Sequence, residues 1–597
     1  MRALGLQTLG LCLAFCGATA QDASIRATGG FSLSIYDDQD RVTAVLSYES
    51  AAKEADSEIA TLTGLSLDLL SEDADTETVQ WRIQSAECSF DFDENRAQSS
   101  SSTTFSSADE GTRVIGNGFE WDQKTGVLSL PSHSESVLAL LESDSTLTVT
   151  SERFEFQNRT GKALYLGNVV VQHPATGDQM SADRLELELA QDSGRPLRGK
   201  ALGEVVLTST LDSEPLYVRS DAAHFDLQVP REESIEFPTG LHWTAADYEG
   251  RGNYGRGSHM DRAVVIRGAA QLSGPFQAGV ATIRSEEYTI TSDQIVFDGE
   301  TELQSDAIRV KASAMTVHQT EEGSISEIQA SEAQLTTRDL ANQDTTTISG
   351  ELLTLTNGVN GLDSLRAQGN ASWAQGGLSG EADRLTMAPE SNTMVAEGSA
   401  KAFWSDPSRP ESPPLHIVAE RYQVDANSAQ FTGAAQLWFG EWSWRAATIE
   451  LEPRDGWEGL NEARGGPSSR IQREAGSPET SEGVGRFQLD SDTAQMAFTS
   501  DKLEPTSVTA QGNIRFESDL RVATGQRADY KLSEESVTIS GTPEISEADG
   551  KRFLGGADSK VTYDLEKGAI HWDGPSRFII PGKALKARGG TSKDTQP

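Results

Sequence analysis

The stretch "GNIRFESDLRVATGQRADYKL", residues 512–532, alternates apolar and polar side chains over most of its length. Side chains of an extended strand point alternately to its two faces, so this pattern predicts strands that are buried on one face only. The charged residues in between, Arg521 among them, are predicted to face outward. The side chains predicted to face inward, here and in the strand that follows, are Ile514, Phe516, Leu520, Val522, Tyr530, Leu532, Val537 and Ile539.

Similar units recur along the chain, in "LGNVVVQHPATGDQMSADRLELEL" and "QGNASWAQGGLSGEADRLTM". Each unit has a Gly-Asn step and, further on, an Ala-Asp step. The Asn and the Asp lie 15, 13 and 16 residues apart in the pairs Asn168 and Asp183, Asn370 and Asp383, and Asn513 and Asp529. We expect Gly-Asn to supply the positive φ of a tight reversal, and Asp to bond the backbone of a turn. Repeated units with one apolar face bury that face by stacking on one another.

The fold class predicted from these patterns is all-β, a stacked antiparallel β-solenoid. Turn residues recur about every ten residues, as is typical of all-β proteins. The best helix candidate is "SVLALLESD" at 136–144, which is too short to organise a domain.

The charge of the chain argues against one class of partner. The 597 residues include 50 Lys and Arg against 91 Asp and Glu, a formal net charge of -41. Such an excess of carboxylates repels phosphate backbones, so we expect no nucleic-acid partner. Only 36% of the residues are hydrophobic, which favours thin layers over one thick core.

Residues 1–20 have the pattern of a cleaved export signal. Arg2 precedes an apolar run, and Ala18-Thr19-Ala20 fits the small-x-small cleavage rule. An alternative is lipid modification of Cys16, which the bulky Phe15 disfavours. No later run approaches the ~18–20 apolar residues of a membrane helix. We expect an exported protein, either a soluble envelope protein or a secreted one, whose mature chain keeps Cys88 alone and therefore has no internal disulfide.

Composition divides the rest of the chain into segments. We predict loops at 96–111 (Ser-rich), 249–262 (Gly-rich) and 406–414 (Pro-rich). The predicted segments are an N-terminal β domain (21–150), β repeats (151–405), β repeats with a Trp-rich strand (406–451), a disordered linker or insert (452–485), C-terminal β repeats (486–582) and a polar tail (583–597).

The Trp-rich strand is "LWFGEWSW" at 437–444, in which Trp438, Trp442 and Trp444 are predicted to share one face. Three tryptophans on one face are typical of a core-facing strand. The alternative is an aromatic platform for a sugar or a lipid.

The sequence contains no recognisable catalytic or cofactor motif. No Gly-Lys step is followed by Ser or Thr, the eight histidines lack metal-ligand spacing, and no Gly-x-Ser-x-Gly step occurs. We therefore predict no enzyme activity, no cofactor and no metal. A glycan-acting enzyme would need converging carboxylates, whereas alternation places the carboxylates on outward strand faces.

The units at Gly167-Asn168, Gly369-Asn370 and Gly512-Asn513 resemble the OstA-type repeats of the LptA family of periplasmic lipopolysaccharide-transport proteins. The clearest match is 508–574, with "TAQGNIRFES", "GQRADYKLSEESVTISGTPEI" and "GADSKVTYDLEKGAIHWDG" in succession. Near the N-terminus, "FSLSIYDDQDRVTAVLS" and "VIGNGFEWDQKTGVLSL" are similar to the related LptC domain.

This resemblance implies an elongated, open β-jellyroll whose two sheets enclose an apolar groove for the acyl chains of lipopolysaccharide or a related glycolipid. It also implies a periplasmic location, an inner-membrane ABC transporter complex and an outer-membrane translocon as partners through β-strand pairing, and end-to-end self-association. The side chains that we predict to contact lipid are Val169, Val171, Leu185, Leu187, Leu189, Leu385, Met387, Ile514, Phe516, Leu520, Val522, Tyr530, Leu532, Val537, Ile539, Val561 and Tyr563.

One alternative from another functional class stays open. A structural or adhesive acidic β-solenoid of the cell envelope would share the repeats and the charge but would bind no lipid. An interior filled by the protein's own side chains would favour that alternative.

Overall fold

The computed structural model describes residues 25–580 except 38, 55–56, 72–77, 141–144, 212–213, 228–233, 259–262, 277–278, 292, 321–324, 339–344, 359–360, 406–413, 426, 455–458, 475–485, 500–504, 519–520 and 549. The predicted export signal, the polar tail and most of the Pro-rich stretch lie outside the described residues.

The prediction of an all-β fold is confirmed. The described residues form 42 strands and two single-turn 3₁₀ helices, η1 (Pro389–Ser391) and η2 (Leu532–Glu534), and no α-helix occurs among them. The strand pairings are antiparallel, for example those of β11 with β12 and of β24 with β25. The chain divides into two compact units, residues 1–274 with 286–292 (unit 1) and residues 275–285 with 293–597 (unit 2).

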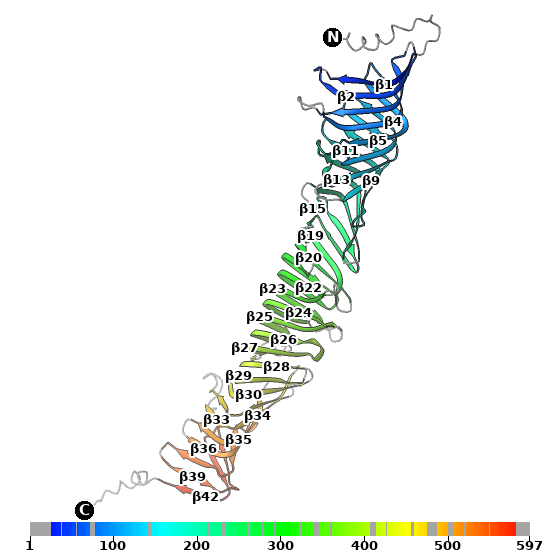
Figure 1. Cartoon of the computed structure of the whole chain (residues 1–597). Coiled ribbons are helices and arrows are strands. Elements are labelled where there is room, and N and C mark those ends of the chain that lie inside the picture. Colours follow the sequence, from blue (N-terminus) through cyan, green and yellow to red (C-terminus); the bar gives the residue numbers. More distant parts are fainter. Residues whose placement is uncertain are drawn as a thin grey trace, which may run out of the picture. The chain divides into compact units, whose positions relative to one another are not determined.

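The strands of each unit follow one another in chain order (Figure 1). Those wholly within unit 1 are β1 (Ile25–Tyr36), β2 (Val42–Lys53), β3 (Ile59–Leu70), β4 (Val79–Asp91), β5 (Arg96–Ser107), β6 (Thr112–Asp122), β7 (Val127–Leu130), β8 (Ser134–Ala139), β9 (Thr146–Ser151), β10 (Arg153–Gln157), β11 (Lys162–His173), β12 (Asp178–Leu189), β13 (Pro196–Leu211), β14 (Glu214–Asp226), β15 (Ser234–Phe237), β16 (Leu241–Ala245), β17 (Tyr248–Gly252) and β18 (Tyr254–Ser258). Strands β19 (Ala263–Phe276) and β20 (Gly279–Ile290) contribute residues to both units.

The strands wholly within unit 2 are β21 (Gln294–Gln304), β22 (Ile308–Gln319), β23 (Ile325–Arg338), β24 (Thr345–Gly358), β25 (Gly361–Gln375), β26 (Leu378–Ala388), β27 (Thr393–Trp404), β28 (Leu415–Val424), β29 (Ala429–Phe439), β30 (Trp442–Arg454), β31 (Gly459–Gly466), β32 (Ser469–Arg473), β33 (Phe487–Ser491), β34 (Thr493–Phe498), β35 (Pro505–Ser518), β36 (Arg521–Lys531), β37 (Ser536–Ser540), β38 (Glu544–Glu547), β39 (Arg552–Gly555), β40 (Lys560–Asp564), β41 (Ile570–Asp573) and β42 (Ser576–Ile579).

Most long strands bend near the middle, and their two halves belong to two different sheets. In unit 1, the first half of β11 pairs with β10 and its second half pairs with β9. In unit 2, the first half of β36 pairs with β38 and its second half pairs with β37. Pairing nevertheless links the described strands into one continuous sheet. Within each unit these bends, which we call the corners, fold that sheet into two layers with an apolar interior between them, and we refer to the two layers as the two sheets.

The Gly-Asn steps form corners rather than tight reversals, which corrects the sequence-based prediction. Gly167 and Asn168 have φ of 76° and 44°, and Gly512 and Asn513 have φ of 76° and 49°. The predicted positive φ is thus present. However, the strand continues beyond each step, and its pairing register shifts there, as between Leu166 and Val169. These features describe a β-bulge, which bends a strand and leads it from one sheet into the other.

Several corners carry no Asn, so the Gly-Asn pattern does not mark them. In each, a glycine and the residue after it both have positive φ; these steps are Gly203-Glu204, Gly268-Ala269, Gly398-Ser399, Gly433-Ala434 and Gly541-Thr542. The signal that could have found them is a Gly followed by a small or polar residue in the middle of an alternating segment.

The Asp residues of the repeats lie at the corners in two copies out of three. A Cβ atom built on Gly203 would lie 2.4 Å from an Asp183 carboxylate oxygen, and one on Gly398 would lie 2.3 Å from an Asp383 oxygen. In the third copy the side chain over the corner, at Gly541, is Gln526, whereas Asp529 lies further along β36. The prediction that Asp529 is the equivalent turn residue is therefore wrong.

Several predicted loops are strands. The Ser-rich stretch 96–111 contains β5, because its Ser and Thr side chains alternate with Ala97 and Phe105, which are 1% and 0% exposed. The helix candidate 136–144 begins within β8. Strands β31 and β32 lie within the predicted disordered segment 452–485, so that prediction is wrong for 459–466 and 469–473; residues 475–485 lie outside the described residues.

The Gly-rich stretch 249–262 is also mainly β, since it holds most of β17 and all of β18. The glycines there leave room for neighbouring side chains. A Cβ atom on Gly250 would lie 2.1 Å from the Trp243 ring, and one on Gly255 would lie 2.4 Å from Leu241. The glycines in these strands allow close packing of neighbouring side chains. A Gly-rich composition alone does not distinguish such a strand from a loop.

Candidate functional site

Most of the side chains predicted to contact lipid lie in the interior between the two sheets. Eleven are at most 3% exposed: Val169, Leu185, Leu187, Leu189, Leu385, Ile514, Phe516, Tyr530, Val537, Ile539 and Val561. Val171, Met387 and Tyr563 are partly exposed. Val171 pairs with the buried Val149, and Met387 pairs with the buried Leu365, so both point toward the interior.

The remaining three side chains that we predicted to contact lipid, Val522, Leu532 and Leu520, are not found among the buried interior residues. Phe516 pairs with Ala523 and Glu517 pairs with Val522, so Val522 lies on the outward face beside Glu517. The hairpin between β35 and β36 shifts the phase of the alternation, and this phase shift turns Arg521 inward. Leu532 belongs to the 3₁₀ turn η2 and is partly exposed. Leu520 lies outside the described residues.

The Trp-rich strand is divided between two faces. Trp442 and Trp444 are 7% and 0% exposed, whereas Trp438 is 37% exposed and pairs with Ser443. The prediction of a shared face for the three rings is wrong because Gly440, with φ of 53°, makes a two-residue turn that reverses the chain. Two of the rings are core residues, as the core-facing alternative expects.

Side chains from both sheets fill the interior of unit 1 near β4–β11. The Trp81 ring lies 4.9 Å from that of Phe105 and 4.5 Å from that of Phe156, and Phe154 lies 5.0 Å from Tyr165, centroid to centroid. All five rings are at most 1% exposed. At these rungs the space between the sheets is therefore occupied, unlike the open groove that the resemblance implies.

Two Trp–Tyr pairs also lie within the interior, one in each unit. The Trp373 indole N–H donates to the Tyr422 hydroxyl at 2.5 Å, and the Trp243 indole N–H donates to the Tyr288 hydroxyl at 3.0 Å. Trp373 and Tyr422 belong to different sheets of unit 2, since Trp373 pairs with Ile348 before the bend of β24 and Tyr422 lies beyond the bend of β28. The hydrogen bond between them fixes the spacing of the two sheets.

A small cavity lies among the C-terminal rungs, within the part of the chain that carries the clearest resemblance. It holds about 10 Å³, enough for about one water molecule. Its lining includes four of the predicted lipid-contacting residues, and the whole set is Phe516, Arg521, Ala523, Ile539, Ile545, Val561 and Tyr563. Arg521 is the one charged residue of this lining.

Opposite the corners, hairpin turns of the two sheets meet along an edge that we call the seam. In unit 2, Arg473 at the end of β32 donates from Nη1 to the Tyr530 hydroxyl and to Glu535 Oε2, both at 2.8 Å. Its guanidinium lies 5.5 Å from the Trp442 ring centroid, and its side chain is 10% exposed. Burial by itself lowers the pKa of Arg473, but the bond to Glu535 and nearby charges outweigh it, so the net shift is upward.

Arg521 makes a second contact across the same seam. It donates from Nη1 to the Gly568 carbonyl at 2.7 Å and from Nε to Glu547 Oε1 at 3.2 Å. Gly568 lies in the turn between β40 and β41, which belong to the other sheet from the start of β36.

Unit 1 has seam contacts of the same kind. The Gln123 amide donates to the Tyr36 carbonyl at 2.7 Å, and the Thr112 hydroxyl donates to the Gly194 carbonyl. Arg195 Nη1 donates to the Leu140 carbonyl at 3.5 Å. The described contacts at the seam are thus side-chain hydrogen bonds and ion pairs, in contrast to the continuous backbone at the corners.

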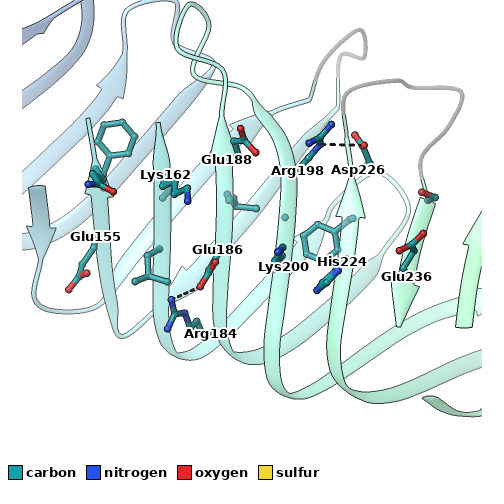
Figure 2. Close-up of a pocket in the computed structure, with 18 of the residues that line it drawn as sticks. Glu155, Lys162, Arg184, Glu186, Glu188, Arg198, Lys200, His224, Asp226 and Glu236 are labelled. Carbon is teal, nitrogen blue, oxygen red and sulfur yellow. Dashed lines mark hydrogen bonds and ion pairs between the residues drawn. The ribbon is translucent and has the colours of Figure 1, made fainter. Parts of the chain in front are cut away.

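The outer face of one unit 1 sheet has a depression of about 980 Å³ that crosses β10–β15 and β18. In Figure 2 its charged side chains stand on neighbouring strands, with Arg184 paired to Glu186 and Arg198 to Asp226. Cross-strand pairing places Glu186, Lys200, His224 and Glu236 in one row. Five Lys and Arg and five Asp and Glu line the depression, so the rows stabilise the sheet without favouring a ligand of either sign.

The remaining chemistry of the described chain is limited. No three or more His, Cys, Asp or Glu side chains within it are placed to hold a metal ion. None of its helices is long and apolar enough to cross a membrane. Cys88 is 1% exposed, and burial raises the pKa of its thiol to about 12, which keeps the thiol protonated and unreactive near neutral pH.

No protein-family model matches the chain, and no curated protein sequence matches it. Among solved structures, LptH, the LptA-homologous periplasmic component of the lipopolysaccharide transport device from Pseudomonas aeruginosa, matches with 13% identity and a TM-score of 0.16, over 29% of this chain and 99% of that one. The extracellular domain of the one-component system BT4673 from B. thetaiotaomicron matches with 10% identity and a TM-score of 0.09, over 89% of this chain and 98% of that one.

Proposed function

We propose that this protein is a periplasmic carrier that shields the acyl chains of lipopolysaccharide or a related glycolipid between its two sheets on the way to the outer membrane. The observation that carries the proposal is the seam, where side-chain contacts alone join two sheets with an apolar interior. Acyl chains enter when these contacts break and the two rows of hairpins separate.

Free-energy estimates favour the entry of an acyl chain between the two sheets. Burying a ~12-carbon acyl chain releases on the order of 10 kcal/mol, at ~0.8 kcal/mol per CH₂ group. A net hydrogen bond contributes about 0.5–1.5 kcal/mol, or about 1.5–3 kcal/mol when a charged group takes part. The free energy released by burying one acyl chain thus exceeds the free energy needed to break a few hydrogen bonds at the seam. Extraction of lipid from a membrane needs further work, for which the sequence has no nucleotide motif, so a partner ATPase supplies it.

The terminal strands support partners of similar fold. Among the described strands, β42 pairs with β39 alone and β1 pairs with β2 alone, which leaves one edge of each for another strand. Phe578 beside that edge is 48% exposed. Pairing at these edges with an inner-membrane ABC transporter complex, an outer-membrane translocon or a second copy of the chain would continue the apolar interior.

The filled rungs of unit 1 favour a second candidate, a structural or adhesive acidic β-solenoid that binds no lipid. Native mass spectrometry of the protein purified from the periplasm separates the two. A carrier retains a multiply acylated glycolipid, and an Ala523→Phe variant, whose ring is larger than the C-terminal cavity and occupies the space between the sheets there, retains much less. Val522→Phe, on the outward face next to it, is the matched control and leaves lipid retention unchanged.

Lipid-free protein with native circular dichroism, which also fails to take up added lipopolysaccharide, would reject the carrier and leave the adhesive solenoid.

A further inference from the structure

We propose that an outward-facing row of aromatic side chains in unit 2 binds a linear, neutral, β-1,4-linked glycan. The row consists of Phe403 on β27, His416 on β28 and Trp438 on β29, and we call it the aromatic row. The platform considered from the sequence needs three tryptophans of one stretch on one face, whereas Trp438 in fact shares its face with rings of two neighbouring strands. The site lies outside the interior and uses none of the residues assigned to lipid, so it does not depend on the carrier function.

The three rings point away from the interior. Each lies between two buried neighbours along its strand, and the side chains of a strand alternate between its two faces. Trp438, for example, lies between Leu437 and Phe439, which are 0% and 7% exposed. His416 pairs with Phe403 on one side and with Trp438 on the other. The rings therefore form one row across β27, β28 and β29, which follow one another along unit 2 in Figure 1.

The aromatic row presents apolar surface to solvent. The Phe403 and His416 rings meet edge to face, with their centroids 4.9 Å apart, and such cross-strand pairs stabilise a sheet by themselves. Trp438 is 37% exposed and pairs with Ser443 on its other side, where no second ring covers it. Val418, diagonal to Trp438 across the same strand pair, is also 37% exposed. Exposed apolar side chains that lie together mark an interaction surface.

Polar side chains extend the aromatic row in both directions. Cross-strand pairing continues the row through residues that are polar but uncharged, namely Ser379, Ser443, Gln472 and Gln488. Gln472 Nε2 donates to Gln488 Oε1 at 2.7 Å. Hydroxyl and amide groups both donate and accept hydrogen bonds, as the hydroxyl groups of a sugar do. The row thus offers ring faces for the C–H surface of a sugar and polar neighbours for its hydroxyl groups.

The next outward row on the same strands is charged, which sets the aromatic row apart. Its members include Glu381, Lys401, Arg445, Arg470 and Asp490. Two ion pairs lie within it, Lys401 with Glu381 at 3.3 Å and Arg470 with Asp490 at 2.7 Å. A ligand on the aromatic row gains no such charged partner there, and the net charge of -41 repels an anionic ligand. The occupant that matches this surface is therefore neutral.

The direction of the aromatic row selects the shape of the glycan. Neighbouring strands lie about 4.8 Å apart, so the rings repeat at a spacing close to the length of one sugar unit in an extended chain. A β-1,4-linked glycan is a flat ribbon that follows such a straight row. An α-1,4-linked glycan of the same sugar curves into a helix and leaves the row after a few units. The row therefore favours the β-linked chain.

The test uses three neutral hexasaccharides, the β-linked cellohexaose and chitohexaose and the α-linked maltohexaose. Calorimetry with the full-length protein measures their binding. We expect the wild type to bind at least one β-linked hexamer several-fold more tightly than maltohexaose. Trp438→Ala is expected to weaken that binding at least about tenfold, because it removes the most exposed ring of the row. Trp438→Phe keeps a ring and is expected to recover most of the affinity.

The matched control is Tyr217→Ala, which removes an exposed ring from unit 1, away from the row, and is expected to leave glycan binding unchanged. A second variant, His416→Ala, keeps the proposal testable if Trp438→Ala fails to fold, and we expect it to weaken binding several-fold. Circular dichroism and the urea midpoint of each variant identify any loss of binding that comes from unfolding.

The outcomes separate the glycan site from the carrier function. If the wild type binds neither β-linked hexamer, if it prefers maltohexaose, or if folded Trp438→Ala and His416→Ala bind as the wild type does, the glycan site is wrong while the carrier function stands. If the wild type binds glycan through Trp438 but retains no lipid, the aromatic row stands, the carrier function fails, and the adhesive solenoid is favoured.

Discussion

At the scale of single residues, the corners depend on glycine for two separate reasons. Gly398 has φ of 77°, a conformation that L side chains rarely adopt, and the Asp383 carboxylate occupies the space where a Cβ atom would lie. Gly376 has φ of 57° in a turn, and nothing lies within 4 Å of the position of its Cβ atom. This pair separates the effect of conformation from the effect of crowding.

We predict that Gly398→Ala lowers the free energy of unfolding by at least about 2 kcal/mol, against about 1 kcal/mol for Gly376→Ala, because it combines strain with a steric clash. Urea unfolding followed by tryptophan fluorescence measures both. Adding Asp383→Ala to Gly398→Ala is expected to recover part of the loss, since it removes the clash. Equal costs for the two glycine variants would show that the corner carboxylate does not crowd Gly398.

At the scale of elements, buried polar pairs within the interior set the separation of the sheets. Tyr288 is 0% exposed and accepts from the indole N–H of Trp243, which is 8% exposed. Burial, partly opposed by this hydrogen bond, raises the pKa of Tyr288 well above its usual value of 10, so its hydroxyl stays protonated at any physiological pH. The pair is therefore a neutral contact that pH does not switch.

Tyr288→Phe is predicted to cost about 1–3 kcal/mol of stability, because it leaves the Trp243 N–H buried without its present acceptor. Tyr217→Phe in the same unit removes a hydroxyl from a side chain that is 46% exposed, and we expect a change within about 0.5 kcal/mol. Chemical unfolding with a probe in unit 1 reports both. Similar small costs for the two variants would mean that the Trp–Tyr bond does not stabilise the interior.

At the scale of the whole molecule, charge governs the response to salt and acid. A net charge of -41 makes exposed carboxylates repel one another at neutral pH. Some carboxylates are stabilised by their neighbours instead. Burial by itself would raise the pKa of Asp122, but the Thr125 N–H and the Arg96 guanidinium outweigh burial and hold the pKa below its usual 3.8. Arg527 likewise outweighs burial at Asp529 and keeps its pKa low.

We predict that, at low salt, the urea midpoint rises between about pH 7 and pH 5, as exposed carboxylates begin to protonate and repel less. It then falls below about pH 3.8, because carboxylates with lowered pKa values stabilise the fold only while ionised. Screening with about 0.5 M salt is expected to abolish the rise, since the Debye length is then only a few ångströms. A midpoint that is independent of salt at pH 7 would argue against self-repulsion.

Sequence alone determined the fold class and most of the interior, for a local reason. Alternation fixes which side of a strand is apolar, whatever that strand pairs with. Examples are Ile514 and Phe516 in one strand, and Val537 and Ile539 in another. The positive φ at Gly167-Asn168 is local for the same reason. These features needed no knowledge of the partner strands.

Only the tertiary structure decided which residues face inward after each turn. It also decided whether a Gly-Asn step bends a strand or reverses it. The hairpin after Ser518 changes the phase, which places Val522 outside and Arg521 inside, and an unbroken period of two cannot predict that change. Whether a Gly-Asn step reverses a strand or bends it depends on the strands that pair on either side. The seam contacts, such as that of Arg473 with Glu535, join residues far apart in sequence, so they exist only once the sheets have stacked.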